Sequence, residues 1–154
     1  ESFQPYDMKY LDGKLLIQDK NNVLADKYET VTKVKPSKEQ LKDMEFGMKI
    51  VKNMKSNAIV IVKDGQTLAS GCGQTSRIWA LKNALENNKD KDFKGAVLAS
   101  DAFFPFDDCV TLANEYGISA VVQPGGSIKD QDSIDACDKY EMTMVFTGTR
   151  HFKH

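Results

Sequence analysis

Short apolar segments alternate with helical patterns along most of the chain, and this alternation constrains the fold more than any other feature. Strands are expected at residues 58–62, 67–70, 96–99, 118–122 and 142–146. Helices are expected at residues 38–55, 75–86, 108–116 and 130–140. This order predicts an α/β fold in three layers, in which helices cover both faces of a mixed, mostly parallel sheet.

Local signals sharpen two of these elements. Ser37 and Gln40 have the spacing of a capping box, in which each side chain bonds the other residue's backbone amide at a helix start. Asp64-Gly65 stands between two strand-like runs and favours a tight hairpin turn. Residues 15–17 and 30–34 are predicted as short strands. The expected organisation is therefore residues 1–36 as short strands packed on the core, and residues 37–154 as one α/β domain.

Composition excludes several classes of protein. A chain of 154 residues suits one domain. With 21 Lys and Arg against 22 Asp and Glu, the net charge of −1 gives no excess for holding nucleic acid. The apolar runs are too short to span a bilayer. Three scattered cysteines predict a reducing, cytoplasmic environment. The chain begins with Glu1 and is expected to be part of a longer or processed protein.

The segment at residues 71–77, Gly-Cys-Gly-Gln-Thr-Ser-Arg, leads from a predicted strand into a helix. Glycines let a backbone approach a ligand, and a helix start offers free amides to an anion. Arg77 adds a planar positive group suited to a phosphate or a carboxylate. The alternative is a plain tight turn with a solvated arginine.

Residues 100–108 read Ser-Asp-Ala-Phe-Phe-Pro-Phe-Asp-Asp and also follow a predicted strand. The aromatic rings could line a flat slot for a heterocycle, with a carboxylate receiving ligand hydroxyls or amines. Alternatively, the rings plug an edge of the core, and Asp107 or Asp108 caps the next helix.

Two further segments follow the last strands. Residues 123–127, Gln-Pro-Gly-Gly-Ser, form either an anion-binding nest or a turn in which Ser127 and Asp130 cap a helix. Residues 147–154 contain Arg150, Lys153 and both histidines of the chain. Histidine exchanges protons near neutral pH, so an ordered tail could take part in chemistry, whereas a frayed tail would not.

Familiar metal and nucleotide motifs are absent from the sequence. There is no His-x-Glu followed by Pro-Cys-x-x-Cys, as zinc deaminases require, and no P-loop. Two histidines and isolated cysteines do not provide zinc-ligand spacing. No metal site is predicted.

Taken together, residues 56–60, 71–77, 99–106, 123–127 and 146–154 resemble the C-terminal half of the AICAR transformylase domain. This domain belongs to the bifunctional AICAR formyltransferase/IMP cyclohydrolase family of purine biosynthesis. The most specific signals are Ser-Asp-Ala-Phe-Phe-Pro-Phe-Asp at residues 100–107 and the terminal Arg-His-Phe-Lys-His.

The resemblance implies a cytidine-deaminase-like fold without zinc, in a cytoplasmic homodimer. It implies formyl transfer from the co-substrate 10-formyltetrahydrofolate to AICAR (aminoimidazole carboxamide ribonucleotide). The residues it assigns to AICAR binding are Arg77, Phe103, Asp108, Arg150 and His154. Those it places beside the folate are Ile78, Pro105 and Phe106. Asn57 and His154 would take part in catalysis.

The family's Lys-His pair for proton handling lies in the other half of the transformylase domain. The isolated chain is therefore expected to be weakly active or inactive. The alternative is a non-catalytic module that binds nucleotide or folate, or that serves dimerisation. Neither nucleic acid nor membrane is an expected partner.

Overall fold

The computed structural model describes residues 5–153. The helices are α1 (Lys38–Val51), α2 (Arg77–Glu86), α3 (Asp108–Glu115) and α4 (Asp130–Lys139). The strands are β1 (Tyr6–Leu11), β2 (Lys14–Asp19), β3 (Glu29–Thr30), β4 (Ile59–Lys63), β5 (Gln66–Gly71), β6 (Val97–Ser100), β7 (Ala120–Gln123) and β8 (Thr143–Phe146). In the described part of the chain, no helix is long and apolar enough to cross a membrane.

Six strands form one sheet in the order β3-β8-β7-β6-β4-β5. The pairs β6–β7 and β7–β8 are parallel, as the alternation of strands and helices predicts. The pairs β3–β8, β4–β5 and β4–β6 are antiparallel. Antiparallel pairing is thus more extensive than the sequence predicted, because β4 pairs with β6 as well as with its hairpin partner β5, and β3 runs against β8.

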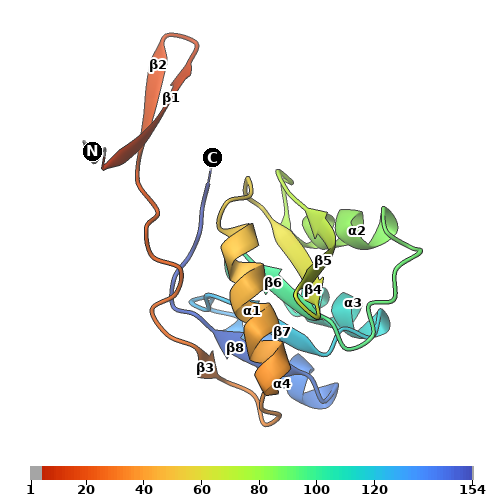
Figure 1. The fold of residues 1–154 in the computed structure, drawn as a ribbon. Helices are drawn as coiled ribbons and strands as arrows, with labels where there is room; N and C mark the ends of the chain where they lie inside the picture. Colours follow the sequence, from red (N-terminus) through yellow and green to blue (C-terminus); the bar gives the residue numbers. More distant parts are fainter. Residues whose placement is uncertain (1–4, 154) are drawn as a thin grey trace.

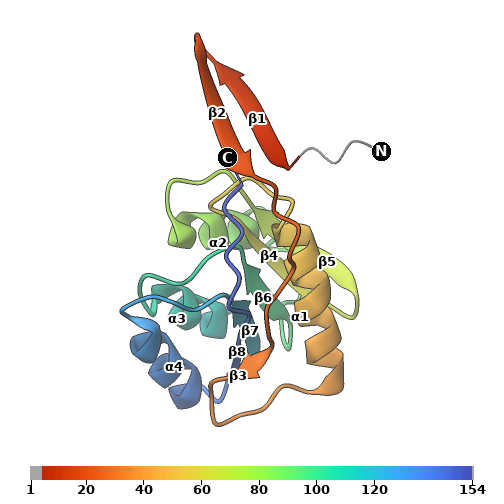
Figure 2. The same ribbon diagram turned by 90° about the vertical axis from the view of Figure 1, so that its left-hand side faces the viewer.

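The period of two along the strands divides the core into two halves. One set of side chains, including Val60, Val97 and Val122, faces Met44 and Met48 of α1. The opposite set, including Ile61 and Leu98, packs on the other three helices. Helix α1 therefore covers one face of the sheet and helices α2, α3 and α4 cover the other (Figures 1 and 2). This arrangement confirms the three-layer α/β fold.

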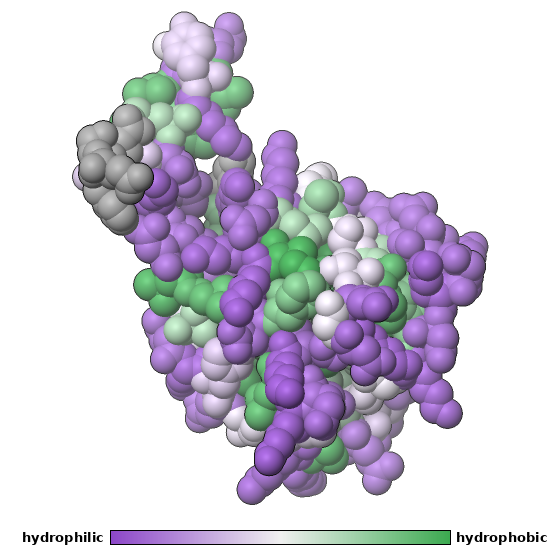
Figure 3. All heavy atoms as spheres, viewed as in Figure 1, coloured by the Kyte–Doolittle hydropathy of each residue, from purple (hydrophilic) through white to green (hydrophobic). Residues whose placement is uncertain are grey.

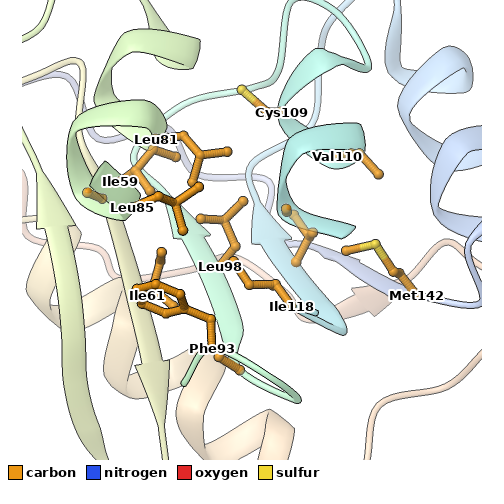
Figure 4. Packing of buried hydrophobic residues seen from close by; sticks show 14 of the residues in the cluster. Ile59, Ile61, Leu81, Leu85, Phe93, Leu98, Cys109, Val110, Ile118 and Met142 are labelled. Atoms are coloured by element: carbon orange, nitrogen blue, oxygen red, sulfur yellow. The ribbon is translucent and has the colours of Figure 1, made fainter. Parts of the chain in front are cut away.

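Figure 4 shows the second half of the core from close by. Leu81 and Leu85 of α2 approach Ile59 of β4 and Leu98 of β6, and Val110 of α3 lies beyond them. All of these side chains are at most 1% exposed. Burial at this level contributes about 1.5–3 kcal/mol for each large apolar side chain, so the sheet is a rigid base for the loops at its ends.

Local predictions hold at several positions. Ser37 accepts from the amide of Gln40 at 3.1 Å, and the Gln40 side chain accepts from the amide of Ser37 at 2.9 Å, so the capping box is present. Helix α1 ends at Val51, earlier than the predicted residue 55. The strand predicted at residues 30–34 is reduced to Glu29–Thr30.

The N-terminal 36 residues divide into two parts. Strand β3 lies in the main sheet beside β8. Strands β1 and β2 form a separate antiparallel hairpin that stands away from the rest of the molecule (Figure 1). Strand β1 was not predicted, although Tyr6, Met8 and Tyr10 alternate with polar residues in the pattern of a strand.

Candidate functional site

The antiparallel placement of β4 beside β6 brings several chain segments to one edge of the sheet. Ile59 pairs with Gly71 of β5 and with Ser100 of β6, so the start of β4 lies beside the ends of both strands. The ends of β7 and β8 lie at the same edge because they run parallel to β6. Four predicted segments therefore follow strands that end at this edge, where open α/β sheets bind ligands.

Asp101 is the polar centre of this edge. Its buried carboxylate accepts from the Ser56 hydroxyl, from the Ala58 amide at 3.2 Å and from the Arg77 guanidinium. Its backbone carbonyl accepts from the amide of His151 at 2.8 Å. One residue thus fixes the start of β4, the start of α2 and the C-terminal tail relative to one another.

Arg77 is the partner of Asp101 in a buried ion pair, with the two side chains 5% and 0% exposed. One Nη donates to the Ala58 carbonyl at 3.3 Å, and the other donates to Oδ1 of Asn57 at 2.9 Å. The solvated-arginine alternative is therefore wrong. The prediction of Arg77 as a ligand-binding group needs a correction. Its ion pair with Asp101 is buried and holds the loops together, so Arg77 also has a structural role.

One nitrogen of the Arg77 guanidinium, the buried Nε, makes no hydrogen bond among the described residues. A buried donor without an acceptor costs about 1–3 kcal/mol. Almost none of the surface of Nε is exposed, so this nitrogen is not accessible to a ligand in the pocket.

Asn57 is held in a defined orientation at the start of β4. Its side-chain oxygen accepts from Arg77, so its nitrogen is the opposite end of the amide and donates to the Gln74 carbonyl at 2.9 Å. An amide nitrogen carries two hydrogens. The second N–H of Asn57 has no acceptor assigned by these contacts and can donate to a ligand.

The C-terminal tail is tied down through His151. Its Nε2–H donates to the Leu24 carbonyl at 2.9 Å, since a carbonyl can only accept, and its Nδ1 accepts from Asn21 at 2.7 Å. Burial lowers the pKa of His151 below its ordinary value, against a smaller opposing effect of the Leu24 hydrogen bond. His151 is thus a neutral structural group, and both of its ring nitrogens are occupied.

A pocket of ≈ 330 Å³ lies between these segments. Its wall consists of Asn57, Thr75, Ser76, Arg77, Ala102, Phe103, Pro105, Arg150 and Phe152. The wall combines two guanidinium groups and an amide with aromatic and proline surfaces. A planar, polar ligand with an anionic or carbonyl group matches this set of side chains.

The pocket gathers five residues selected from the sequence, namely Asn57, Arg77, Phe103, Pro105 and Arg150. The other candidates lie on adjoining elements and are not part of this wall. Ile78 packs against the core, Phe106 is exposed, and Asp108 accepts from the amide of Cys109 at 2.8 Å. The prediction for His154 lies outside the described residues.

Sequence reasoning missed the organising role of Asp101. Asp101 was included only as a member of the aromatic segment at residues 100–108. An Asp directly after an apolar strand is nevertheless a signal for a site at the end of a sheet. Ser76, which accepts from the amide of Trp79 at 3.4 Å and caps α2, was also not singled out.

The segment at residues 123–127 has its amides already in use. The amide of Gly125 donates to Gln123 and that of Gly126 donates to Asp130, at 3.0 and 2.7 Å. Ser127 accepts from the amide of Lys129, but Lys129 is the N-cap of α4 and makes no side-chain cap bond, so the predicted capping box is absent. This segment is a turn.

The described residues offer no metal-binding cluster, and Cys109 is not an activated thiol. No group of three or more His, Cys, Asp or Glu side chains in residues 5–153 is arranged to hold a metal ion. Burial raises the pKa of the Cys109 thiol well above its ordinary value, which removes it as a nucleophile at neutral pH.

The fold and the pocket define a three-layer α/β domain with a polar ligand site at the edge of its sheet. Residues 1–87, more than half of the chain, match the family described as AICARFT/IMPCHase bienzyme. The chain belongs to this family.

Relatives of known name agree with this assignment. The chain is 85% identical over 153 residues to the bifunctional purine biosynthesis protein PurH of Clostridioides difficile (strain 630), covering 99% of this chain and 30% of the relative. The PurH protein of Clostridium perfringens (strain SM101 / Type A) is 56% identical over 147 residues, covering 96% and 28%. The chain thus spans less than a third of these relatives.

Solved structures that match part of the chain include dCMP deaminase from the cyanophage S-TIM5. Its apo form matches with a TM-score of 0.49 and 17% identity, over 71% of this chain and 98% of that chain. The same enzyme in complex with dCMP and dUMP matches with a TM-score of 0.49 and 20% identity.

Proposed function

We propose that this chain is the C-terminal half of the transformylase domain of the family. In this role it binds AICAR and faces 10-formyltetrahydrofolate during formyl transfer. The observation that carries the proposal is the single pocket that gathers Asn57, Arg77, Phe103, Pro105 and Arg150 from separate segments. The resemblance assigns Arg77, Phe103 and Arg150 to AICAR, Pro105 to the folate, and Asn57 to catalysis.

The reaction joins the 5-amino nitrogen of AICAR to the formyl carbon, while the bond from that carbon to the folate nitrogen breaks. The attacking amine loses a proton and the departing folate nitrogen gains one. An aromatic amine that is conjugated with a carboxamide is a poor nucleophile, so orientation is a large part of the task. Phe103 and Pro105 supply apolar surfaces that can restrict a planar ring to one orientation.

Polar groups of the pocket have separate tasks in this proposal. Arg150 is exposed at the pocket wall and balances negative charge on the ligand, while Arg77 lines the same wall and holds Asn57 in place. The remaining N–H of Asn57 donates to the formyl oxygen, where negative charge develops as the amine attacks.

The proton that the attacking amine loses needs an acceptor that is not among the pocket residues named above. His151 is excluded as the base because both ring nitrogens are engaged and burial lowers its pKa. Together with the absence of the family's internal Lys-His pair, this supports a binding and orienting role for the chain. The full reaction then depends on the other half of the transformylase domain, in a cytoplasmic homodimer.

The test is a formyl-transfer assay with AICAR and 10-formyltetrahydrofolate. The chain is assayed alone and after addition of the remaining region of a family enzyme as a separate polypeptide. We expect negligible turnover alone and restored turnover in the mixture, and we expect Asn57→Ala to lower the restored rate. Turnover by the chain alone at the rate of an intact family enzyme would contradict the proposed division of labour. No turnover in a mixture that forms a stable complex would contradict the formyltransferase role.

A further inference from the structure

A second and larger cleft lies on the other side of the C-terminal tail from the pocket. Its volume is ≈ 660 Å³, and Arg150 and Phe152 line both spaces. The remaining wall consists of Asp7, Gln18, Asp19, Lys20, Asn21, Asn22, Lys52, Asn53 and Lys153. The cleft therefore lies between the β1–β2 hairpin, the end of α1 and the tail, where Figure 3 shows hydrophilic residues.

Positive charge dominates this wall. Four cationic side chains, Lys20, Lys52, Arg150 and Lys153, meet from three separate segments, whereas two carboxylates face them from the hairpin. Within residues 5–153, no salt bridge engages Lys52, Arg150 or Lys153. The chain as a whole has a net charge of −1, so this concentration of positive charge is local.

The end of α1 opposes this charge only in part. The C-terminus of a helix carries about half a negative charge, and Lys52 is the C-cap residue of α1. Among the described residues of the wall, four cations stand against two carboxylates, and this difference exceeds the contribution of the helix. The electrostatic potential of the cleft therefore favours an anion with more than one charge.

The cationic groups are carried by backbone that is held in place. The Lys153 carbonyl accepts from the amide of Ser56 at 2.9 Å, and its Nζ donates to the Asn53 carbonyl at 3.2 Å. The Phe152 carbonyl accepts from Nε2 of Gln18 at 2.7 Å. The guanidinium of Arg150 lies over the Phe152 ring, 5.1 Å from its centroid. The tail is thus fixed between the two spaces, and Arg150 stands at their junction.

We propose that the basic cleft binds the polyanionic end of a ligand, namely a phosphate group or a chain of carboxylates. The sources of these groups rest on the proposed function. A phosphate would come from the ribonucleotide, and a carboxylate chain would come from the folate. Lys52 and Lys153 are the binding groups that lie outside the pocket wall. Asp7 and Asp19 weaken binding and limit the cleft to strongly charged anions.

The test is isothermal titration calorimetry of the intact chain with tripolyphosphate and with tetraglutamate, at low and at high salt. Neither probe contains a heterocyclic ring, so the result is independent of whether the pocket binds AICAR. We expect binding of at least one probe, weakened by salt. The double variant Lys52→Gln/Lys153→Gln should bind about tenfold or more weakly, since each lost pair is a charge-assisted hydrogen bond.

Matched variants separate charge in the cleft from charge elsewhere. Lys89→Gln/Lys91→Gln removes the same charge from an exposed loop and should change affinity less than twofold, whereas Asp19→Asn should tighten binding. Lys52→Arg/Lys153→Arg should restore affinity, which excludes misfolding as the cause. Tighter binding of tripolyphosphate would assign the cleft to a phosphate, and tighter binding of tetraglutamate to a carboxylate chain. No binding of either probe at low salt, or equal losses in the cleft and loop variants, would overturn the proposal.

Discussion

The β1–β2 hairpin and strand β7 lie at opposite extremes of burial. Every residue of β7 is buried, between parallel neighbours on both sides. In the hairpin, Met8 pairs with Ile17 and Tyr10 with Leu15, so these four side chains share one face with Tyr6. All five are exposed, from 47% for Tyr6 to 75% for Tyr10. Figure 3 shows hydrophobic residues on this hairpin, away from the body of the molecule.

The two regions therefore obtain their stability from different sources. Strand β7 is stabilised by the chain itself, through side chains packed on both faces of the sheet. A two-stranded hairpin is at best marginally stable in water without a further layer. The hairpin contributes to the molecule mainly through polar contacts beside the tail, of which the bond from Gln18 to the Phe152 carbonyl is one.

Hydrogen exchange is expected to show the largest difference between the two regions. Amides of β7 should exchange only on global unfolding, because opening this strand exposes both halves of the core. Amides that pair β1 with β2 should exchange at least about 10³-fold faster, given the usual stability of a domain. Exchange measured residue by residue by NMR checks this, and equal protection in both regions would show that the hairpin is part of the core.

Truncating one large side chain in the core and one in the hairpin should reproduce the contrast in stability. Phe104 is fully buried in the core cluster, so Phe104→Ala should lower the free energy of unfolding by about 3–5 kcal/mol. Ile17 is 55% exposed, so Ile17→Ala should change it by about 0.5 kcal/mol or less. Urea unfolding of both variants provides the measurement. A large loss for Ile17→Ala would mean that the hairpin packs on a surface in solution.

The core elements and the polar network differ in how far they can be predicted from the sequence. The core elements were predicted because they combine hydrophobic period, a capping box at Ser37 and glycine-rich turns. The polar network was not, because Arg77 and Asp101 meet only once β4 lies antiparallel to β6. No local pattern encodes that pairing. Strand β1 does carry a local signal, the alternation of Tyr6, Met8 and Tyr10 with polar residues, so it could have been predicted from the sequence.

The junction between hairpin, tail and core should respond to pH through His151. The unfolded chain protonates this histidine near its ordinary pKa of 6.5, whereas burial keeps the folded form neutral to lower pH. The stability contributed by His151 is therefore complete above about pH 6.5 and is lost as the pH falls toward the lower pKa of the folded state.

His151→Gln isolates this contribution. Loss of the hydrogen bonds to Asn21 and Leu24 should cost about 1–3 kcal/mol at neutral pH, and the difference from the wild-type chain should shrink as the pH falls below 6.5. Unfolding free energies at several pH values provide the measurement. A difference that stays constant with pH would show that His151 titrates alike in the folded and unfolded chain.

The central claim is that the pocket at the edge of the core sheet holds AICAR, and calorimetric titration of the chain with AICAR tests it most directly. Arg150 lines this pocket, is exposed and forms no salt bridge among the described residues, so Arg150→Gln should leave the fold intact. We expect the wild-type chain to bind AICAR, Arg150→Gln to lose about 1.5–3 kcal/mol of binding free energy, and the loop variant Lys89→Gln to bind like the wild type. Equal affinity of the wild-type chain and Arg150→Gln, or no binding by the wild-type chain, would contradict the claim.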